Sequence, residues 1–382
     1  MAGPRNPYGP PHHHASKADA DATVARWWPV HLSAVCRYWR AVVLLSPSLW
    51  RVIVLEKPCH LSSAAYLKMI DLCLARSSGL PLDVHISRPL SAEQTAWVAH
   101  TLAAQSARIR TFHVDDYSRR PDLFEHFRSR PGPVLANFTV RCVASTCSLP
   151  MVFKDFTPSL RHLELKGIRT WKNHFRDLRT VHFENAGGDK TFVNFLAFLA
   201  ESPGLEELSL RHVKLRAVEP QPDSLFDPLP VSFPLLSQIE MRDISSGLAA
   251  DILTSMRPST SLCCQLTLDR GPGGLPRSEP ARLLHALTQM QVFKDVTQVQ
   301  FDADRQSTWF ATLRIVAVGT SSSLHLITDA DMLVSLKDDY MAALVGLLAQ
   351  CRVRELFVKD EDRKSTRLNS SHSGESRMPS SA

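Results

Sequence analysis

The chain has no apolar run approaching the about 18 consecutive residues that a transmembrane helix requires. Its N-terminus also lacks an apolar segment of signal-peptide length ahead of a small-residue cleavage site. Its 8 cysteines form no Cys-x-x-Cys pair, which argues against a zinc site. Most have apolar neighbours, and we interpret them as small buried hydrophobes in a reducing compartment. We expect a soluble protein of the cytoplasm or nucleus, with no membrane partner.

Clustered positive charge is also absent. The formal net charge is +6, but the last 21 residues supply four basic and two acidic groups, so the rest of the chain carries +4. These charges are interspersed, with no basic run and no interleaved aromatics. We do not expect a nucleic-acid partner.

Catalytic signatures are missing as well. The glycine-rich segment GPGGL at 271–275 lacks the residues of a phosphate loop or a dinucleotide-binding turn, and we interpret it as a turn. No G-x-S-x-G, H-E-x-x-H or kinase pattern occurs. His113, Asp115 and Asp116 follow a strand-like segment and are interpreted as solvated polar residues. We predict no catalytic residue, no metal ligand and no cofactor.

The two ends of the chain have little to pack into a core. Residues 1–25 are polar and rich in Pro and Ala, and we expect them to be disordered. Residues 362–372 read DRKSTRLNSSH, which back-translates into a common sequencing-library adapter. We therefore interpret 362–382 as a disordered artefactual tail and expect the native sequence to stop near Glu361.

Residues 31–54, HLSAVCRYWRAVVLLSPSLWRVIV, predict two short helices. Apolar residues recur at i, i+3, i+4 and i+7 and give the first helix one apolar stripe, while Tyr38 lies off that stripe. Ser46-Pro47 then interrupts the helix, because a residue before proline is disfavoured in helical geometry. Two helices of this size cannot form a core alone and need a partner surface.

These residues resemble the second half of the F-box, a short helical motif whose pattern includes V-C-R-x-W-R followed by P-x-L-W-x-x-I. The resemblance implies docking on the Skp-type adaptor of a cullin–RING (SCF-type) ubiquitin ligase. The L-P-x-E-I-L-like helix that normally opens the motif has no counterpart upstream of Trp27. The adaptor-binding positions carried over by the resemblance are Leu32, Val35, Cys36, Trp39, Pro47, Leu49, Trp50 and Ile53.

The resemblance continues just downstream. Residues 64–87 predict a helix followed by an alternating strand, joined by the R-S and P-L-x-V passage common in fungal F-box proteins.

A degenerate repeat occupies the rest of the chain. Apolar residues at i, i+3 and i+5 recur at steps of 18 to 33 residues up to position 296, and a last gap of 57 residues fits two repeats. Helical patterns at 191–202, 246–256, 280–293 and 338–350 lie between them. The triplets begin at Ile109, Leu135, Leu160, Leu178, Leu205, Leu236, Cys263, Val296 and Val353.

This pattern is similar to leucine-rich repeats, in which strand–helix units stack because each has too little core alone. We predict an α/β fold: a partial, helical F-box over 26–58, then an irregular leucine-rich-repeat solenoid with parallel strands and outer helices over 59–361.

The resemblance implies a non-enzymatic, substrate-recruiting subunit whose repeats hold an unidentified protein near the ligase. The alternatives are a leucine-rich-repeat scaffold that no longer joins a ligase, and an enzyme of unrecognised type. Exposed strand positions between the apolar anchors are the candidate substrate contacts: Arg161, His162, Glu164, Glu206, Glu207, Ser209, Gln238 and Glu240.

Overall fold

A computed structural model describes most of the chain between residues 28 and 369. The segments 1–25 and 271–275, Cys59 and Asp116, most of the predicted helix at 338–350 and the end of the tail lie outside the described residues. The described ranges are 28–55, 63–87, 92–115, 121–143, 147–216, 230–258, 261–268, 279–290, 293, 296–307, 310–319, 322–329, 345–349, 351, 353–360 and 363–369.

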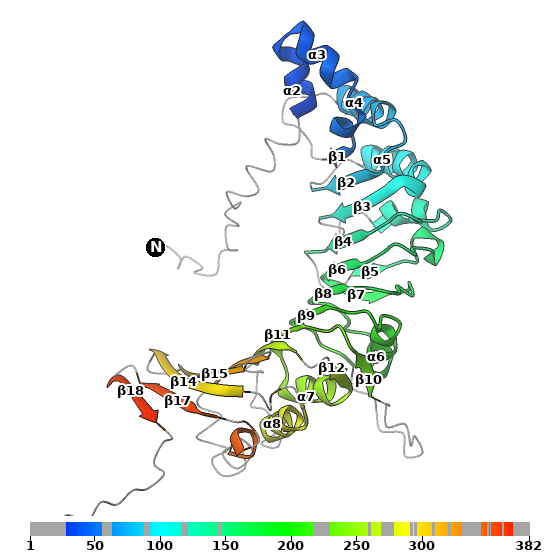
Figure 1. Cartoon of the computed structure of the whole chain (residues 1–382). Helices are drawn as coiled ribbons and strands as arrows, with labels where there is room; N and C mark the ends of the chain where they lie inside the picture. The colour runs from blue at the N-terminus through cyan, green and yellow to red at the C-terminus, as the bar shows by residue number, and fades with distance from the viewer. Residues whose placement is uncertain are drawn as a thin grey trace, which may run out of the picture.

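The described residues form a mixed α/β structure around one large, mostly parallel sheet of 14 strands (Figure 1). Strand order follows chain order over its first nine strands, and every neighbouring pair there is parallel. These strands are β1 (Val52–Leu55), β2 (Leu82–Ile86), β3 (Ile109–Val114), β4 (Asn137–Arg141), β6 (His162–Lys166), β8 (Thr180–Glu184), β9 (Glu207–Arg211), β11 (Gln238–Ile244) and β13 (Cys263–Leu268).

Figure 1 shows helices α4, α5 and α6 along one side of these strands. Short 3-10 helices η2 (Ser106–Arg108), η4 (Pro121–Phe127) and η5 (Phe153–Asp155) connect other strands. Two small parallel sheets pair β5 (Cys147–Leu149) with β7 (Ile168–Trp171) and β10 (Val231–Phe233) with β12 (Met256–Pro258). The labelled α-helices after the first strand are α4 (Ser63–Arg76), α5 (Ala92–Ala104), α6 (Phe192–Ala200), α7 (Ser246–Thr254) and α8 (Glu279–Gln289), and residues 345–349 are also helical.

The apolar triplets form the core of the sheet. Alternate residues of each strand point to opposite faces, so the apolar members of successive triplets align on one buried face. The triplet predicted to begin at Cys263 is wrong by two residues, because Cys264 is the residue that pairs with Ile239. One aligned buried row consists of Phe112, Phe138, Leu163, Val181, Leu208, Ile239, Cys264 and Leu324.

The sheet is not parallel throughout, which corrects the prediction of parallel repeats up to residue 361. β14 (Val296–Ser307), β15 (Phe310–Gly319) and β16 (Ser323–Asp329) pair antiparallel with their chain neighbours, and β16 joins β13. The connections between these strands are two and three residues long. A parallel crossover needs a dozen residues or more, so such short connections permit only hairpins.

The first of the two predicted helices is divided into two α-helices in the structure, and the second is a short 3-10 helix. α2 (Trp28–Val35) and α3 (Arg37–Leu44) are separated by Cys36, whose backbone is extended and whose Sγ accepts a hydrogen bond from the Trp39 N–H at 3.5 Å. η1 (Pro47–Trp50) follows, with its proline in the first turn, where no N–H is needed. β1 then begins the sheet inside the range 26–58 that we expected to be helical.

The tail is not wholly without regular structure. β17 (Glu355–Asp360) pairs parallel with β14, and β18 (Arg363–Asn369) pairs antiparallel with β17. Without β18, β17 would be the edge strand of the sheet and would present unpaired N–H and C=O groups. The polar segment that follows β17 in the chain forms hydrogen bonds with these groups as β18.

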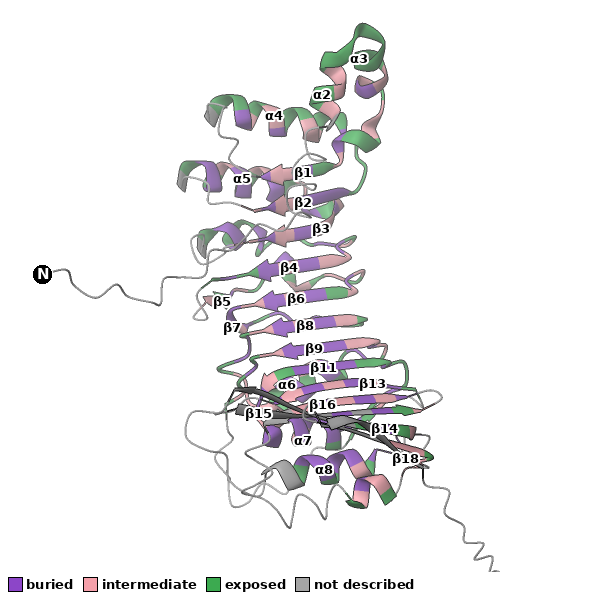
Figure 2. Ribbon diagram, turned by 90° about the vertical axis from the view of Figure 1, so that its left-hand side faces the viewer, coloured by how far each residue is buried: buried purple, intermediate pink, exposed green. Residues whose placement is uncertain are grey.

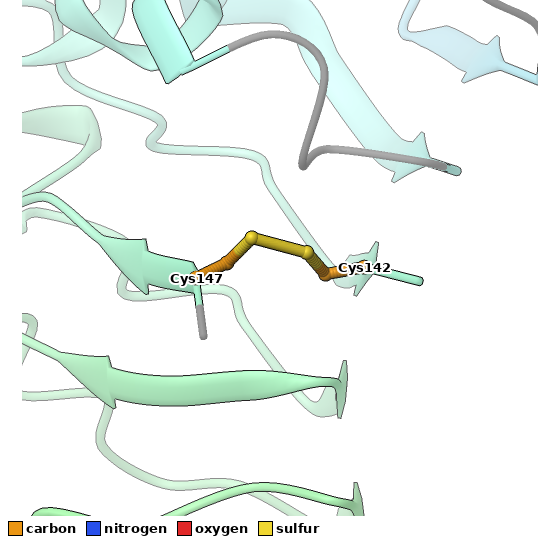
Figure 3. Close-up of a disulfide and its surroundings, with 2 residues drawn as sticks. All are labelled: Cys142 and Cys147. Carbon is orange, nitrogen blue, oxygen red and sulfur yellow. A yellow bond between two sulfur atoms is a disulfide. The ribbon is translucent and has the colours of Figure 1, made fainter. Parts of the chain in front are cut away.

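Figure 3 shows a disulfide between Cys142 and Cys147. We expected most cysteines to be small buried hydrophobes in a reducing compartment, whereas Cys142, just after β4, and Cys147, at the start of β5, form a disulfide. Five other cysteines in the described part of the chain form no disulfide. Burial raises the pKa of the Cys73 thiol to about 11 and also raises that of Cys264, so both stay protonated at neutral pH.

Candidate docking surface

Large apolar side chains are exposed on the helices that precede the sheet. Figure 2 shows most of the α3 ribbon in green, the colour of exposed residues. The exposed fraction is 65% for Val35, 72% for Tyr38, 42% for Trp39, 82% for Leu45 and 38% for Leu49. The rings of Tyr38 and Trp39 pack edge to face, with 6.1 Å between centroids. We call these five residues the helical patch. Several large apolar side chains exposed on one short helical segment are typical of a protein–protein contact.

The other predicted adaptor-binding residues are placed differently. Trp50 and Ile53 are each 2% exposed and belong to the interior. Leu32 and Pro47 are half-buried, and Cys36 is exposed at the start of α3. Of the eight predicted positions, Val35, Cys36, Trp39 and Leu49 are therefore exposed, whereas Trp50 and Ile53 are buried.

Trp50 attaches α3 to the rest of the molecule. Its Nε1–H donates to the carbonyl oxygen of Val43 at 2.9 Å, and Val43 is the fully buried residue of α3. A guanidinium N–H of Arg76, at the end of α4, donates to the carbonyl oxygen of Leu44 at 3.4 Å. These contacts satisfy backbone carbonyls at the end of α3 that have no partner within the helix.

An ion-pair network continues from η1 into the sheet. The carboxylate of Asp83 on β2 lies 3.7 Å from the Arg51 guanidinium and accepts hydrogen bonds from Arg110 at 2.6 to 3.0 Å. The Asp83 N–H also donates to the Arg51 carbonyl oxygen at 3.0 Å. The segment from η1 to Arg51, which follows the helical patch in the chain, is thereby attached to the first strands of the sheet.

Six of the predicted substrate-binding residues alternate with the buried row and so lie on the opposite face of the sheet: His162, Glu164, Glu207, Ser209, Gln238 and Glu240. Arg161 and Glu206 come just before β6 and β9. Most of the eight are already engaged. The Glu164 carboxylate lies 2.8 Å from Arg141, Glu206 lies 3.2 Å from Arg179, and Glu207 lies 3.4 Å from His182. The Arg161 guanidinium donates to three backbone carbonyl oxygens at 2.8 to 3.3 Å. His162 and Gln238 are exposed.

Two of these residues are buried, which corrects the expectation that all eight are exposed. Glu240 is 6% exposed and Ser209 is 2% exposed. The Glu240 carboxylate accepts hydrogen bonds from Ser209 at 2.9 Å and from Arg211 at 2.9 and 3.1 Å, and it is also paired with Arg242. A carboxylate enclosed by two arginines stabilises the sheet face and is not available to a partner.

A pocket of about 770 Å³ lies at the carboxyl ends of β3 to β9. Its charged lining side chains pair with one another or with neighbouring Glu240, so neither sign of charge is left in excess. The charged residues that line it are Asp115, Arg141, Glu164, Lys166, Glu184 and Arg211.

Tyr38 and Leu45 are members of the helical patch that sequence reasoning missed. Tyr38 lies off the apolar stripe of its helix, and helical geometry alone places such a residue away from the core. That signal was available for Tyr38. Leu45 follows the last residue of α3, where no periodicity extends, and nothing in the sequence indicated its exposure.

Searches of protein-family models, curated proteins and solved structures found no match to this chain. Within the described residues, no three potential metal ligands lie together. Nor does any helix in that part of the chain combine the length and apolar character needed to cross a membrane.

Proposed function

We propose that the chain is an F-box protein with a degenerate leucine-rich-repeat solenoid. The run of nine parallel strands in chain order supports the solenoid, because the buried apolar row that begins at Phe112 continues through Val84 on β2 to Ile53 on β1. A single strand–connection unit could not bury this row alone, whereas neighbours of the same kind bury it together.

A repeated backbone feature supports the same proposal. The residue after Lys166 of β6 is Gly167, and the equivalent positions on the next three strands are Asn185, His212 and Asp243. All four have positive φ, between 50° and 68°. Glycine, asparagine and aspartate tolerate this conformation best, so successive units share one turn.

The proposed function is recruitment of a protein substrate to a cullin–RING ubiquitin ligase, with no catalysis by the chain itself. The observation that carries it is the helical patch, because Val35, Trp39 and Leu49 match the F-box pattern and are also exposed. A Skp-type adaptor would cover this patch. The sheet body would then hold a substrate at high effective concentration near a charged ubiquitin-conjugating enzyme.

Co-purification with a Skp-type adaptor and cullin tests the proposal. The full chain should retain the adaptor, and Val35→Asp or Trp39→Ala should reduce recovery at least tenfold, because each removes an exposed apolar side chain from the helical patch. Val143→Asp is the matched control, since Val143 is 85% exposed on a turn after β4. Equal recovery of all three variants would contradict adaptor docking at this surface.

The second candidate is a leucine-rich-repeat scaffold that joins no ligase. It is favoured by one observation, the absence of an L-P-x-E-I-L-like segment upstream of Trp27. A chain extended with the upstream coding sequence separates the two. If the extended chain also fails to bind the adaptor, the scaffold is the better account.

A further inference from the structure

A left-handed turn interrupts the connection between β5 and β6. Phe153, Lys154 and Asp155 have φ values of 55°, 54° and 54°, a left-handed conformation that is unfavourable for a phenylalanine or a lysine and better tolerated by an aspartate. Three consecutive residues of this kind persist only when the surrounding structure holds them in place.

Several contacts hold this turn. Phe153 is fully buried among the phenylalanines of the core. The side chain of Asn173, 4% exposed, accepts from the Val152 N–H at 2.9 Å and donates to its carbonyl oxygen at 2.7 Å. The Asp155 carboxylate accepts from the His174 N–H at 2.8 Å and lies 2.9 Å from the His174 ring. The turn is thus a firmly fixed element of the surface.

Apolar side chains are exposed around the turn. The exposed fraction is 52% for Phe156, 38% for Met151 and 37% for Val134. Their segments are adjacent, because the Gly132 N–H donates to the Phe156 carbonyl oxygen at 3.0 Å. The turn therefore adds Phe156 to an apolar surface drawn from two connections, the one before β4 and the one between β5 and β6.

Positive charge borders this surface. Arg130, Lys154 and Lys172 are exposed, and no ion pair joins them to another residue in the described parts of the chain. Neighbouring Arg128, in contrast, is paired with Glu125 at 2.9 Å. We call the whole surface the flank patch; it consists of Arg130, Val134, Met151, Lys154, Phe156 and Lys172.

We propose that the flank patch binds an acidic segment of a partner protein that carries at least one large apolar side chain. The apolar side chain would cover Phe156 and Met151, and carboxylates on either side of it would pair with Lys154 and Lys172. The fixed turn lowers the cost of binding, because these groups are already in position before the partner arrives. The proposal is independent of adaptor docking, since it uses no residue of the helical patch.

The test is fluorescence anisotropy with the purified full chain and a synthetic peptide of alternating aspartate and glutamate around one Leu-Phe pair. Lys154→Glu and Phe156→Ser should each weaken binding at least tenfold. Lys214→Glu and Val143→Ser are matched controls at exposed positions outside the patch, and they should stay within twofold of the wild type.

Lys154→Gly separates binding from folding. Glycine favours the left-handed conformation, so this variant should unfold at a higher temperature and yet bind the peptide more weakly. The proposal is overturned if the four substitutions at and outside the patch have equal effects. It is also overturned if a peptide with serines in place of Leu-Phe binds as tightly, or if phosphatidylserine vesicles or single-stranded DNA compete better than the peptide.

Discussion

Trp39 and Trp50 share one sequence motif, but truncating Trp50 should mainly lower stability, whereas truncating Trp39 should mainly lower adaptor binding. Trp50 is 2% exposed and its indole N–H donates to Val43, so Trp50→Ala should lower the free energy of unfolding by about 3–5 kcal/mol. Trp39 is 42% exposed, so Trp39→Ala should cost about 1 kcal/mol or less. Adaptor binding should be lost in the Trp39 variant even though the protein remains folded.

Urea denaturation of both variants, monitored by circular dichroism, gives the two free energies, and adaptor co-purification at low temperature gives the binding. Trp50→Phe is the control, because it retains most of the buried area and loses the indole hydrogen bond. It should fall between the wild type and Trp50→Ala. Equal destabilisation by Trp39→Ala and Trp50→Ala would refute the division of this motif into one anchor and one exposed contact.

Two further predictions concern the sheet. Gly167→Ala should lower the free energy of unfolding by about 2 kcal/mol or more, because φ is +68° and an added Cβ would lie 2.3 Å from the Cys142 carbonyl oxygen. Gly204→Ala is the control, since no atom lies within 4 Å of its added Cβ, and thermal unfolding should place it within about 0.5 kcal/mol of the wild type. Burial alone would raise the pKa of Glu240, but hydrogen bonds and the charge of Arg211 hold this pKa below its usual 4.5. The ionised Glu240 side chain therefore stabilises the fold above pH 4.5, and this stabilisation is lost as the pH falls through the lowered pKa. Glu240→Gln should therefore cost about 1–3 kcal/mol in urea denaturation at pH 7 and much less at pH 3, and an equal cost at both would contradict this assignment.

The sequence predicted most of the parallel sheet because its signal is local. Each triplet such as Leu160, Leu163 and Leu165 carries its own spacing, and the helices near 191–202 and 246–256 are found close to their predicted positions. The break at Cys36 was not predictable from periodicity, since an apolar stripe can continue across two helices that share one face.

Features that depend on distant residues were missed. The antiparallel pairing of β14 to β16 follows from connection length, which apolar triplets do not record. The burial of Glu240 depends on arginines contributed by its own strand and by β9, and polar residue type alone suggested exposure. The flank patch joins segments that are separated by up to 42 residues, between 130 and 172, and only the fold brings them together.

Amide hydrogen exchange, measured with and without a purified Skp-type adaptor, tests the central claim most directly. Because the helical patch is exposed while its anchor is buried, the adaptor should slow exchange in residues 35–49 and leave the strands from β4 to β11 unchanged. No protection at 35–49, or protection confined to the sheet, would contradict an F-box docking role for this surface.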